Sequence, residues 1–224
     1  MSSEPPPPPS IPSSGQPGQP DQPLEVGAAV SYAWAKFQQH AGALILIALV
    51  IALANLIGFG ISFVVDNFFV ALVLQIVFFI IGQILTVGII NASLMVTRGE
   101  TPELGKVFAT ERLGPFIIAS ILYGIAIFVG LVLCIIPGII AAFMLSFYGF
   151  YVLDQNAEPV AALSASFNLV KDNFGIVFLI VLVAFVINFI GAALCGIGLL
   201  VTAPICWIIL GYAYRRLNNQ PVAP

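Results

Sequence analysis

The sequence predicts an all-α integral membrane protein with six transmembrane helices. Its composition points to this fold class, because 60% of the 224 residues are hydrophobic and only 8% are charged. Soluble domains are on average about half apolar and about a quarter charged, and a soluble domain of this size could not bury so much apolar surface. The apolar residues also fall in long uncharged runs, which suit helices that cross a bilayer.

The first 24 residues differ from the rest of the chain. They contain five consecutive prolines at 5–9, and further Pro together with Ser, Gln and Gly. Such a segment has no apolar face to bury, so we expect a disordered cytoplasmic tail with polyproline II character. A docking peptide for a proline-reading domain is one interpretation. A solvated tether is favoured, because no basic residue is placed to orient such a ligand.

Residues 25–216 form the predicted transmembrane domain, and residues 217–224 a short polar tail. The organising unit is clearest at 159–191. Its first part is amphipathic at helical spacing, and its second part, from a turn near Gly175, is uncharged. We interpret the unit as a helix lying on the bilayer followed by a helix that enters it. The predicted apolar stripe of the first part consists of Val160, Leu163, Phe167, Val170 and Phe174.

A similar amphipathic helix is expected at 25–40, with Val30, Trp34 and Phe37 on one stripe. Six spans follow from the apolar runs and from the turn signals between them, including Pro137-Gly138. They are expected at 41–65, 68–96, 114–136, from that turn to 153, 175–194, and from the glycine-rich turn at 195–198 to about 214.

The sequence matches itself when it is shifted by 133 residues, so that 27–58 lies over 160–191 without a gap. Residues 102–136 resemble a weaker middle copy. The sequence therefore predicts three parallel repeats, each an interfacial helix plus a helical hairpin, rather than inverted repeats. The identical non-aliphatic pairs are Ser31 with Ser164, Gly42 with Gly175, Asn55 with Asn188, and Gly58 with Gly191.

All seven Lys and Arg residues lie outside the predicted spans on one side of the membrane, whereas the opposite turns carry only Asp66 as a charge. The protein is expected in a bacterial inner membrane, and by the positive-inside rule both termini are expected in the cytoplasm. The cations are Lys36, Arg98, Lys106, Arg112, Lys171, Arg215 and Arg216. They form no basic stripe, so nucleic-acid binding is not expected.

The segment at 137–175, PGIIAAFMLSFYGFYVLDQNAEPVAALSASFNLVKDNFG, resembles a recurrent bacterial membrane module. It is similar to the membrane domain found beside some glycerophosphodiester phosphodiesterases, over about residues 25–216. The proline-rich start resembles that of actinobacterial membrane proteins. The resemblance implies a stand-alone membrane protein without that hydrolase activity, because the catalytic barrel of those enzymes is a separate soluble domain.

No enzyme, metal or cofactor is expected, because the predicted spans contain no ionisable residue other than cysteine and tyrosine. Asn55 and Asn188 are candidates for a polar path or headgroup contact, with interhelical hydrogen bonding as the alternative. Asp154 and Lys171, which flank Glu158 in one loop, are candidates for headgroup or cation contact, or form a solvated helix end. Cys134 and Cys195 lie at matching turns, where a disulfide is an alternative to free thiols.

These residues favour a protein that binds lipids or membrane partners. The alternative is a transporter or channel for a lipid-like or neutral solute, with its path running past Asn55 and Asn188.

Overall fold

The computed structural model describes residues 24–61, 67–109, 111–194 and 196–224. All regular secondary structure in this part of the chain is helical. The predicted proline-rich tail lies outside the described residues apart from Leu24, and so does Asp66. The helices are α1 Val26–Ile61, α2 Phe68–Arg98, α3 Leu104–Val107, α4 Leu113–Leu133, α5 Ile135–Met144, α6 Tyr148–Asp154, α7 Pro159–Asp172, α8 Phe174–Ala193 and α9 Leu199–Leu217.

Five segments are long and apolar enough to cross a membrane: α1, α2, α4, the α5–α6 pair, and α8. The chain is therefore a polytopic all-α membrane protein, as the sequence predicts. The predicted sixth span forms as α9, but it does not reach the same apolar content. Helix α9 carries Pro204 and, in its last turn, Arg215 and Arg216. It packs against α1, α2 and α8, and a helix enclosed by protein needs fewer lipid-facing apolar residues.

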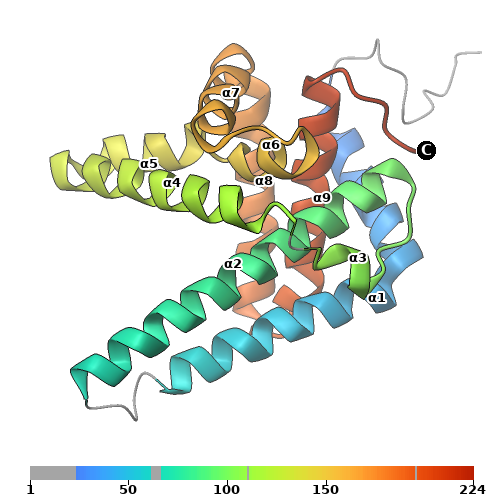
Figure 1. The fold of residues 1–224 in the computed structure, drawn as a ribbon. Helices are drawn as coiled ribbons and strands as arrows, with labels where there is room; N and C mark the ends of the chain where they lie inside the picture. The colour runs from blue at the N-terminus through green and yellow to red at the C-terminus, as the bar shows by residue number, and fades with distance from the viewer. Residues whose placement is uncertain (1–23, 62–66, 110, 195) are drawn as a thin grey trace, which may run out of the picture.

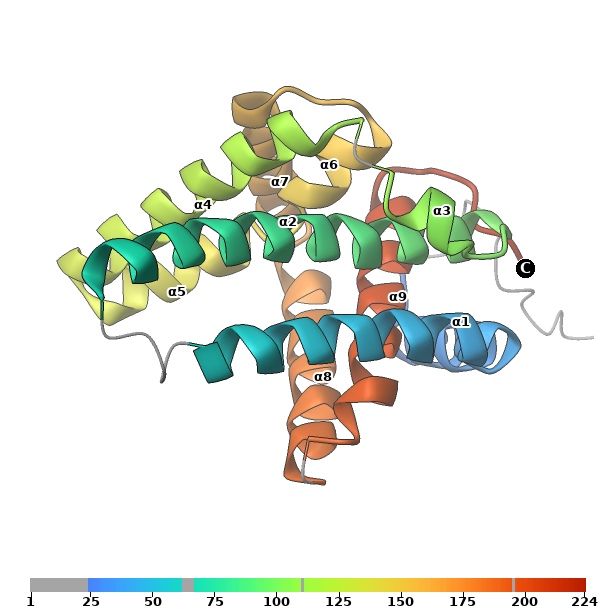
Figure 2. The ribbon, with the colours of Figure 1, turned by 60° about the horizontal axis from the view of Figure 1, so that its bottom comes forward.

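Three helical hairpins, α1–α2, α4–α5 and α8–α9, diverge from a shared base (Figure 1). Helices α8 and α9 run crosswise to the other two hairpins in Figure 2, and the short helices α3, α6 and α7 lie at the base. The hairpin tips are highly exposed, as Phe69 at 75% and Leu133 at 76% illustrate. The hydrophobic core instead lies at the base, where α1, α2, α6 and α9 meet, with Leu44, Val96, Phe150 and Tyr214 fully buried.

Both predicted junctions between an interfacial helix and a span are present. Helix α1 bends at His40, whose backbone is not helical, and α7 gives way to α8 at Asn173. The predicted apolar stripes, however, face the core only in part: Phe37 and Val170 are buried, but the other members are half-buried or exposed. The faces packed on the core carry small residues, including Ala29 and Ala162, whereas Trp34 and Phe167 are 50% and 44% exposed. Large side chains on the outer face are stable here because the surrounding solvent is lipid.

The predicted turn at Pro137-Gly138 is wrong. The chain turns at Cys134, which has an extended backbone, and Pro137 lies in the first turn of α5. Proline is tolerated there because the first N–H groups of a helix have no intrahelical partner. Gly138 packs against Gly130, where an added Cβ would lie 2.8 Å from the Gly138 Cα, so the two helices meet closely just behind their turn.

The predicted fourth span is broken at 145–147, between α5 and α6. Ser166 of α7 stabilises this break. Its Oγ accepts a hydrogen bond from the Phe147 backbone N–H at 3.0 Å and donates to the Met144 carbonyl oxygen at 3.2 Å. One buried hydroxyl thus satisfies two backbone groups that the interrupted helix leaves without partners.

The segment after α9 packs onto the base. The Arg215 guanidinium donates to the Pro221 carbonyl oxygen, the Ala223 N–H donates to the Thr97 carbonyl oxygen at 2.9 Å, and Val222 is buried. The predicted polar tail at 217–224 is therefore part of the folded base.

Candidate functional site

Asp154, at the end of α6, is the centre of an ionic cluster at the base. Its side chain is 5% exposed and forms an ion pair with Arg98 at the end of α2. Arg215 of α9 approaches the same carboxylate at 3.8 Å. The Tyr214 hydroxyl and the Gln220 amide each donate a hydrogen bond to it, at 3.1 and 2.9 Å. Asp154 therefore joins α2, α6, α9 and the following segment.

The cluster is electrostatically satisfied. Burial lowers the pKa of the Arg215 guanidinium from its ordinary value, and the Asp154 carboxylate acts in the opposite direction. An arginine remains charged in this setting, so the cluster holds two cations around one carboxylate. Its geometry is that of a structural connection, because the Asp154 oxygens already accept hydrogen bonds from Arg98, Tyr214 and Gln220 and lie 3.8 Å from Arg215.

Lys171, the other charged candidate, does not join Asp154. It lies exposed in the last turn of α7 and forms no ion pair with any described residue. Glu158 instead lies 3.8 Å from Arg112, a residue that the sequence did not single out for this role. Arg112 also donates to the carbonyl oxygens of Asn156 and Ala157 at 2.7 and 3.0 Å, and so anchors the loop before α7 to the start of α4.

A small charged pocket lies beside this anchor. It has a volume of about 270 Å³ and lies between the last turns of α2, the segment around α3, and the end of α6. Its charged lining residues are Arg98, Glu100, Lys106, Glu111 and Arg112. The pocket lies at the end of the helices that carries the Lys and Arg residues, where the chain leaves the apolar segments.

A larger apolar groove separates the first and third hairpins. Its volume is about 590 Å³, and α1, α2 and α9 line it with mainly small and apolar residues such as Ala52, Gly82 and Ala203. Three polar side chains also line it: Asn55, Gln83 and Thr86. The Thr86 hydroxyl donates to the Gly82 carbonyl oxygen of its own helix at 2.8 Å. The groove is thus mainly apolar, with one amide group on α1 and another on α2.

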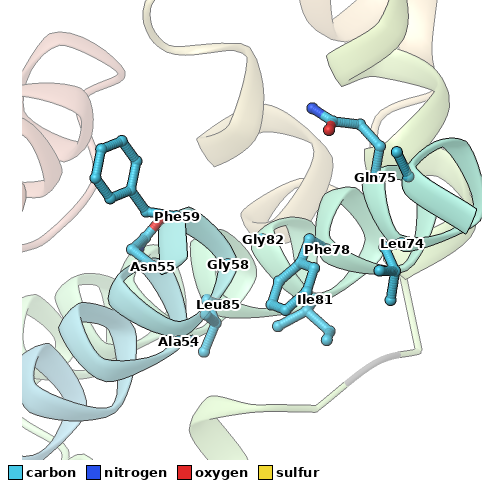
Figure 3. Close-up of a pocket in the computed structure, with 11 residues that line it drawn as sticks. Ala54, Asn55, Gly58, Phe59, Leu74, Gln75, Phe78, Ile81, Gly82 and Leu85 are labelled. Carbon is cyan, nitrogen blue, oxygen red and sulfur yellow. The ribbon is translucent and has the colours of Figure 1, made fainter. Parts of the chain in front are cut away.

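A second cavity of about 550 Å³ opens between α1 and α2 (Figure 3), lined by Asn55, Phe59, Gln75 and Phe78 among others. Asn55, Gly82 and Leu85 line both cavities, so the two cavities are neighbours. The Phe78 ring of α2 packs against Gly58 of α1, where an added Cβ would lie 2.9 Å from the ring.

The two repeat-related asparagines have different surroundings. The Asn55 amide nitrogen donates to the Ile51 carbonyl oxygen at 2.8 Å within α1, and the residue faces the groove. Asn188 lies on α8 and lines neither cavity, and its buried Oδ1 has no hydrogen-bond partner among the described residues. The two residues do not share one of these cavities.

The cysteine prediction is only partly within the described chain. Cys134 is a free, exposed thiol at the turn of the α4–α5 hairpin, whereas Cys195 lies outside the described residues. The disulfide therefore stays a prediction. Cys206 is buried, and its thiol lies 3.2 Å from the Ala184 carbonyl oxygen across the α8–α9 contact.

Comparison with known proteins finds relatives without an assigned activity. The chain is 27% identical over 226 residues to the uncharacterized protein Rv2560 of Mycobacterium tuberculosis, covering 88% of this chain and 70% of the relative. The uncharacterized protein Mb2590 of Mycobacterium bovis is similar to the same extent. No known family matches the chain, and no solved structure matches it.

Proposed function

We propose that this protein is a non-enzymatic lipid-binding protein of the bacterial inner membrane, with the acyl chain of a phospholipid held in the groove between α1, α2 and α9. The observation that carries the proposal is the shape and chemistry of this groove, an apolar space of about 590 Å³ where α9 crosses α1 and α2. An acyl chain is the apolar ligand that a bilayer supplies in excess.

The polar residues of the groove support binding of a lipid acyl chain rather than passage of an ion. The groove is lined by two amides and one hydroxyl, with no charged residue. Ion and proton paths through membranes usually contain ionisable side chains. The mycobacterial relatives support a bacterial membrane, and the distribution of Lys and Arg supports cytoplasmic termini. Kinship with membrane domains of the glycerophosphodiester phosphodiesterase type rests on sequence resemblance.

Trp207 provides a direct test, because it lines the groove and the chain has only one other tryptophan, Trp34. The W34F variant is reconstituted in bilayers with and without phospholipids brominated on the acyl chain, which quench tryptophan fluorescence on contact. We expect strong quenching of Trp207.

A groove-filling variant makes this test specific. An added Cβ at Gly82 meets nothing within 4 Å, so G82L is expected to fold and to occupy the groove. Gly124 on α4 has equally open surroundings but lies outside the groove, so G124L is the matched control. The proposal requires quenching to fall in W34F/G82L and to persist in W34F/G124L. Equal quenching in both would assign the signal to surrounding bulk lipid and refute the proposal.

A further inference from the structure

The charged pocket at the base has a combination of groups that the acyl-chain groove does not use. Its walls carry three cations, Arg98, Lys106 and Arg112, and two carboxylates, Glu100 and Glu111. Cations alone would suit any phosphate-bearing ligand. The carboxylates change this preference, because they repel a simple anion and attract a second, positive group on the same ligand.

Arg112 is held in place with an unused donor. Its guanidinium donates to two backbone carbonyls of the loop before α7, while its buried Nε has no hydrogen-bond partner among the described residues. A buried N–H without a partner is costly, so this atom is expected to find one in a ligand or in water. Arg98 is fixed by its ion pair with Asp154. Two of the three cations are therefore pre-positioned by the fold.

Both carboxylates are available. Glu100 and Glu111 are exposed, and neither forms an ion pair with a residue in the described ranges. Lys106 pairs only with its helical neighbour Glu103, at 3.2 Å and with both side chains largely exposed, a contact of little energetic weight. The pocket thus offers unpaired negative charge next to two fixed arginines and one lysine, Lys106, that can turn toward a ligand.

We infer that this pocket binds a headgroup that carries both a phosphate and a primary ammonium, the phosphoethanolamine group. Arg112 and Lys106 contact the phosphate, and Glu100 and Glu111 contact the ammonium. A volume of about 270 Å³ admits a headgroup but not a whole lipid, since pockets for complete drug-sized ligands start at about 300 Å³. The source of the headgroup is either phosphatidylethanolamine or a soluble phosphoethanolamine compound.

This site is separate from the proposed acyl-chain groove. The two use different residues of α2: the pocket uses Asn91, Leu94, Met95 and Arg98, and the groove uses residues from Phe79 to Ile89. The G82L variant therefore leaves the pocket intact, and failure of one proposal does not entail failure of the other.

The test is native mass spectrometry of the full chain in mild detergent, titrated with phosphatidylethanolamine, phosphatidylglycerol and O-phosphoethanolamine. We expect phosphatidylethanolamine to bind about tenfold more tightly than phosphatidylglycerol, a difference of about 1.4 kcal/mol. Displacement of the lipid by equimolar O-phosphoethanolamine would identify the soluble compound as the ligand, and retention of the lipid would identify phosphatidylethanolamine. Equal binding of the two lipids would overturn the inference.

Three variants separate specificity from general lipid retention. The double variant E100Q/E111Q is expected to lose the preference for phosphatidylethanolamine and to gain affinity for phosphatidylglycerol. K106Q is expected to weaken the binding of both lipids. K171Q, an identical charge change at an exposed residue outside the pocket, is expected to leave the binding of both unchanged. A double variant that keeps the wild-type preference, or K106Q that behaves like K171Q, would also overturn the inference.

Discussion

His40 and Asn173 have nearly the same non-helical backbone conformation, with φ and ψ of −120° and 20° at His40 and −122° and 30° at Asn173. They lie 133 residues apart, the offset at which the sequence matches itself. Each residue ends an interfacial helix and begins a transmembrane one. Arg112, at the start of α4, has a similar conformation, with φ −105° and ψ 14°.

Burial follows the same offset. Ala29, Ala33 and Phe37 are buried in α1, and so are their counterparts Ala162, Ser166 and Val170 in α7. Further along, Leu44 and Ile47 correspond to Val177 and Ile180, all buried, while Trp34 and Phe167 are both exposed. These positions support the predicted repeat, and they indicate that these two copies present the same face to the base.

Removing the Ser166 hydroxyl is predicted to loosen the break between α5 and α6. The S166A variant leaves the Phe147 N–H and the Met144 carbonyl without their buried partner, at a cost of about 1–3 kcal/mol in the free energy of unfolding. This loss of stability is measured by unfolding the variant and the wild type in mixed detergent micelles. The control is S164A, an exposed serine on the same helix, which is expected to change stability by less than about 0.5 kcal/mol. Equal stabilities would show that the hydroxyl contributes nothing at the break.

Neutralising Asp154 is predicted to destabilise the base strongly. In D154N, Arg215, whose side chain is 9% exposed, loses its buried counter-charge, and removing one partner of a buried pair costs about 3 kcal/mol or more. The same unfolding measurement applies. E158Q removes an exposed carboxylate 3.8 Å from Arg112 and is expected to cost less than about 1 kcal/mol. If the two variants were equally stable, Asp154 would not have the connecting role described here.

Gly211 is predicted to be intolerant of a side chain. A Cβ added there would lie 2.1 Å from the Ser93 Oγ, which donates to the Trp207 carbonyl oxygen at 2.7 Å across the α2–α9 contact. Overpacking in G211A is expected to cost about 1–3 kcal/mol. In G42A an added Cβ meets nothing within 4 Å, so this variant is expected to be neutral or slightly stabilising. A thermal shift assay in detergent compares them, and a G211A protein as stable as G42A would contradict the close contact.

Topology can be tested with the exposed thiol at Cys134. With Cys195 and Cys206 replaced by Ala, a membrane-impermeant maleimide is expected to label Cys134 in intact cells. In a background without native cysteines, K171C is expected to react only after permeabilisation, because cytoplasmic loops carry the excess of Lys and Arg. The reverse labelling pattern would invert the proposed orientation.

Helix positions could be predicted from the sequence, but helix faces could be predicted only in part. The apolar runs and the amphipathic segments before them gave the junctions near His40 and Asn173 to within about two residues. Hydrophobic periodicity identifies an apolar face, yet lipid and a protein core are both apolar solvents for it. The small residues Ala29 and Ala162 pack inward because they allow close helix contact, and Trp34 and Phe167 are left facing outward.

The candidate site was harder to predict, because its contacts join distant parts of the chain. Lys171 lies nearer to Asp154 in sequence, but Arg98 and Arg215 contact it, from the ends of α2 and α9. The charged pocket likewise forms where segments that are distant in the sequence meet at the base. One available signal was that both arginines end long helices on the charged side of the predicted membrane, where helix ends meet.

Because α1 and α9 are in extensive contact, the fold cannot be completed until α9 has been made, well after α1 has entered the membrane. At about 5–20 residues per second of synthesis, the ribosome needs on the order of 10 s to translate the chain between the two helices. During this delay the α1–α2 hairpin is already in the bilayer, while the wall that α9 contributes to the groove does not yet exist. Newly made protein therefore passes through a stage in which lipid fills the place of a helix, and the arrival of α9 must displace it.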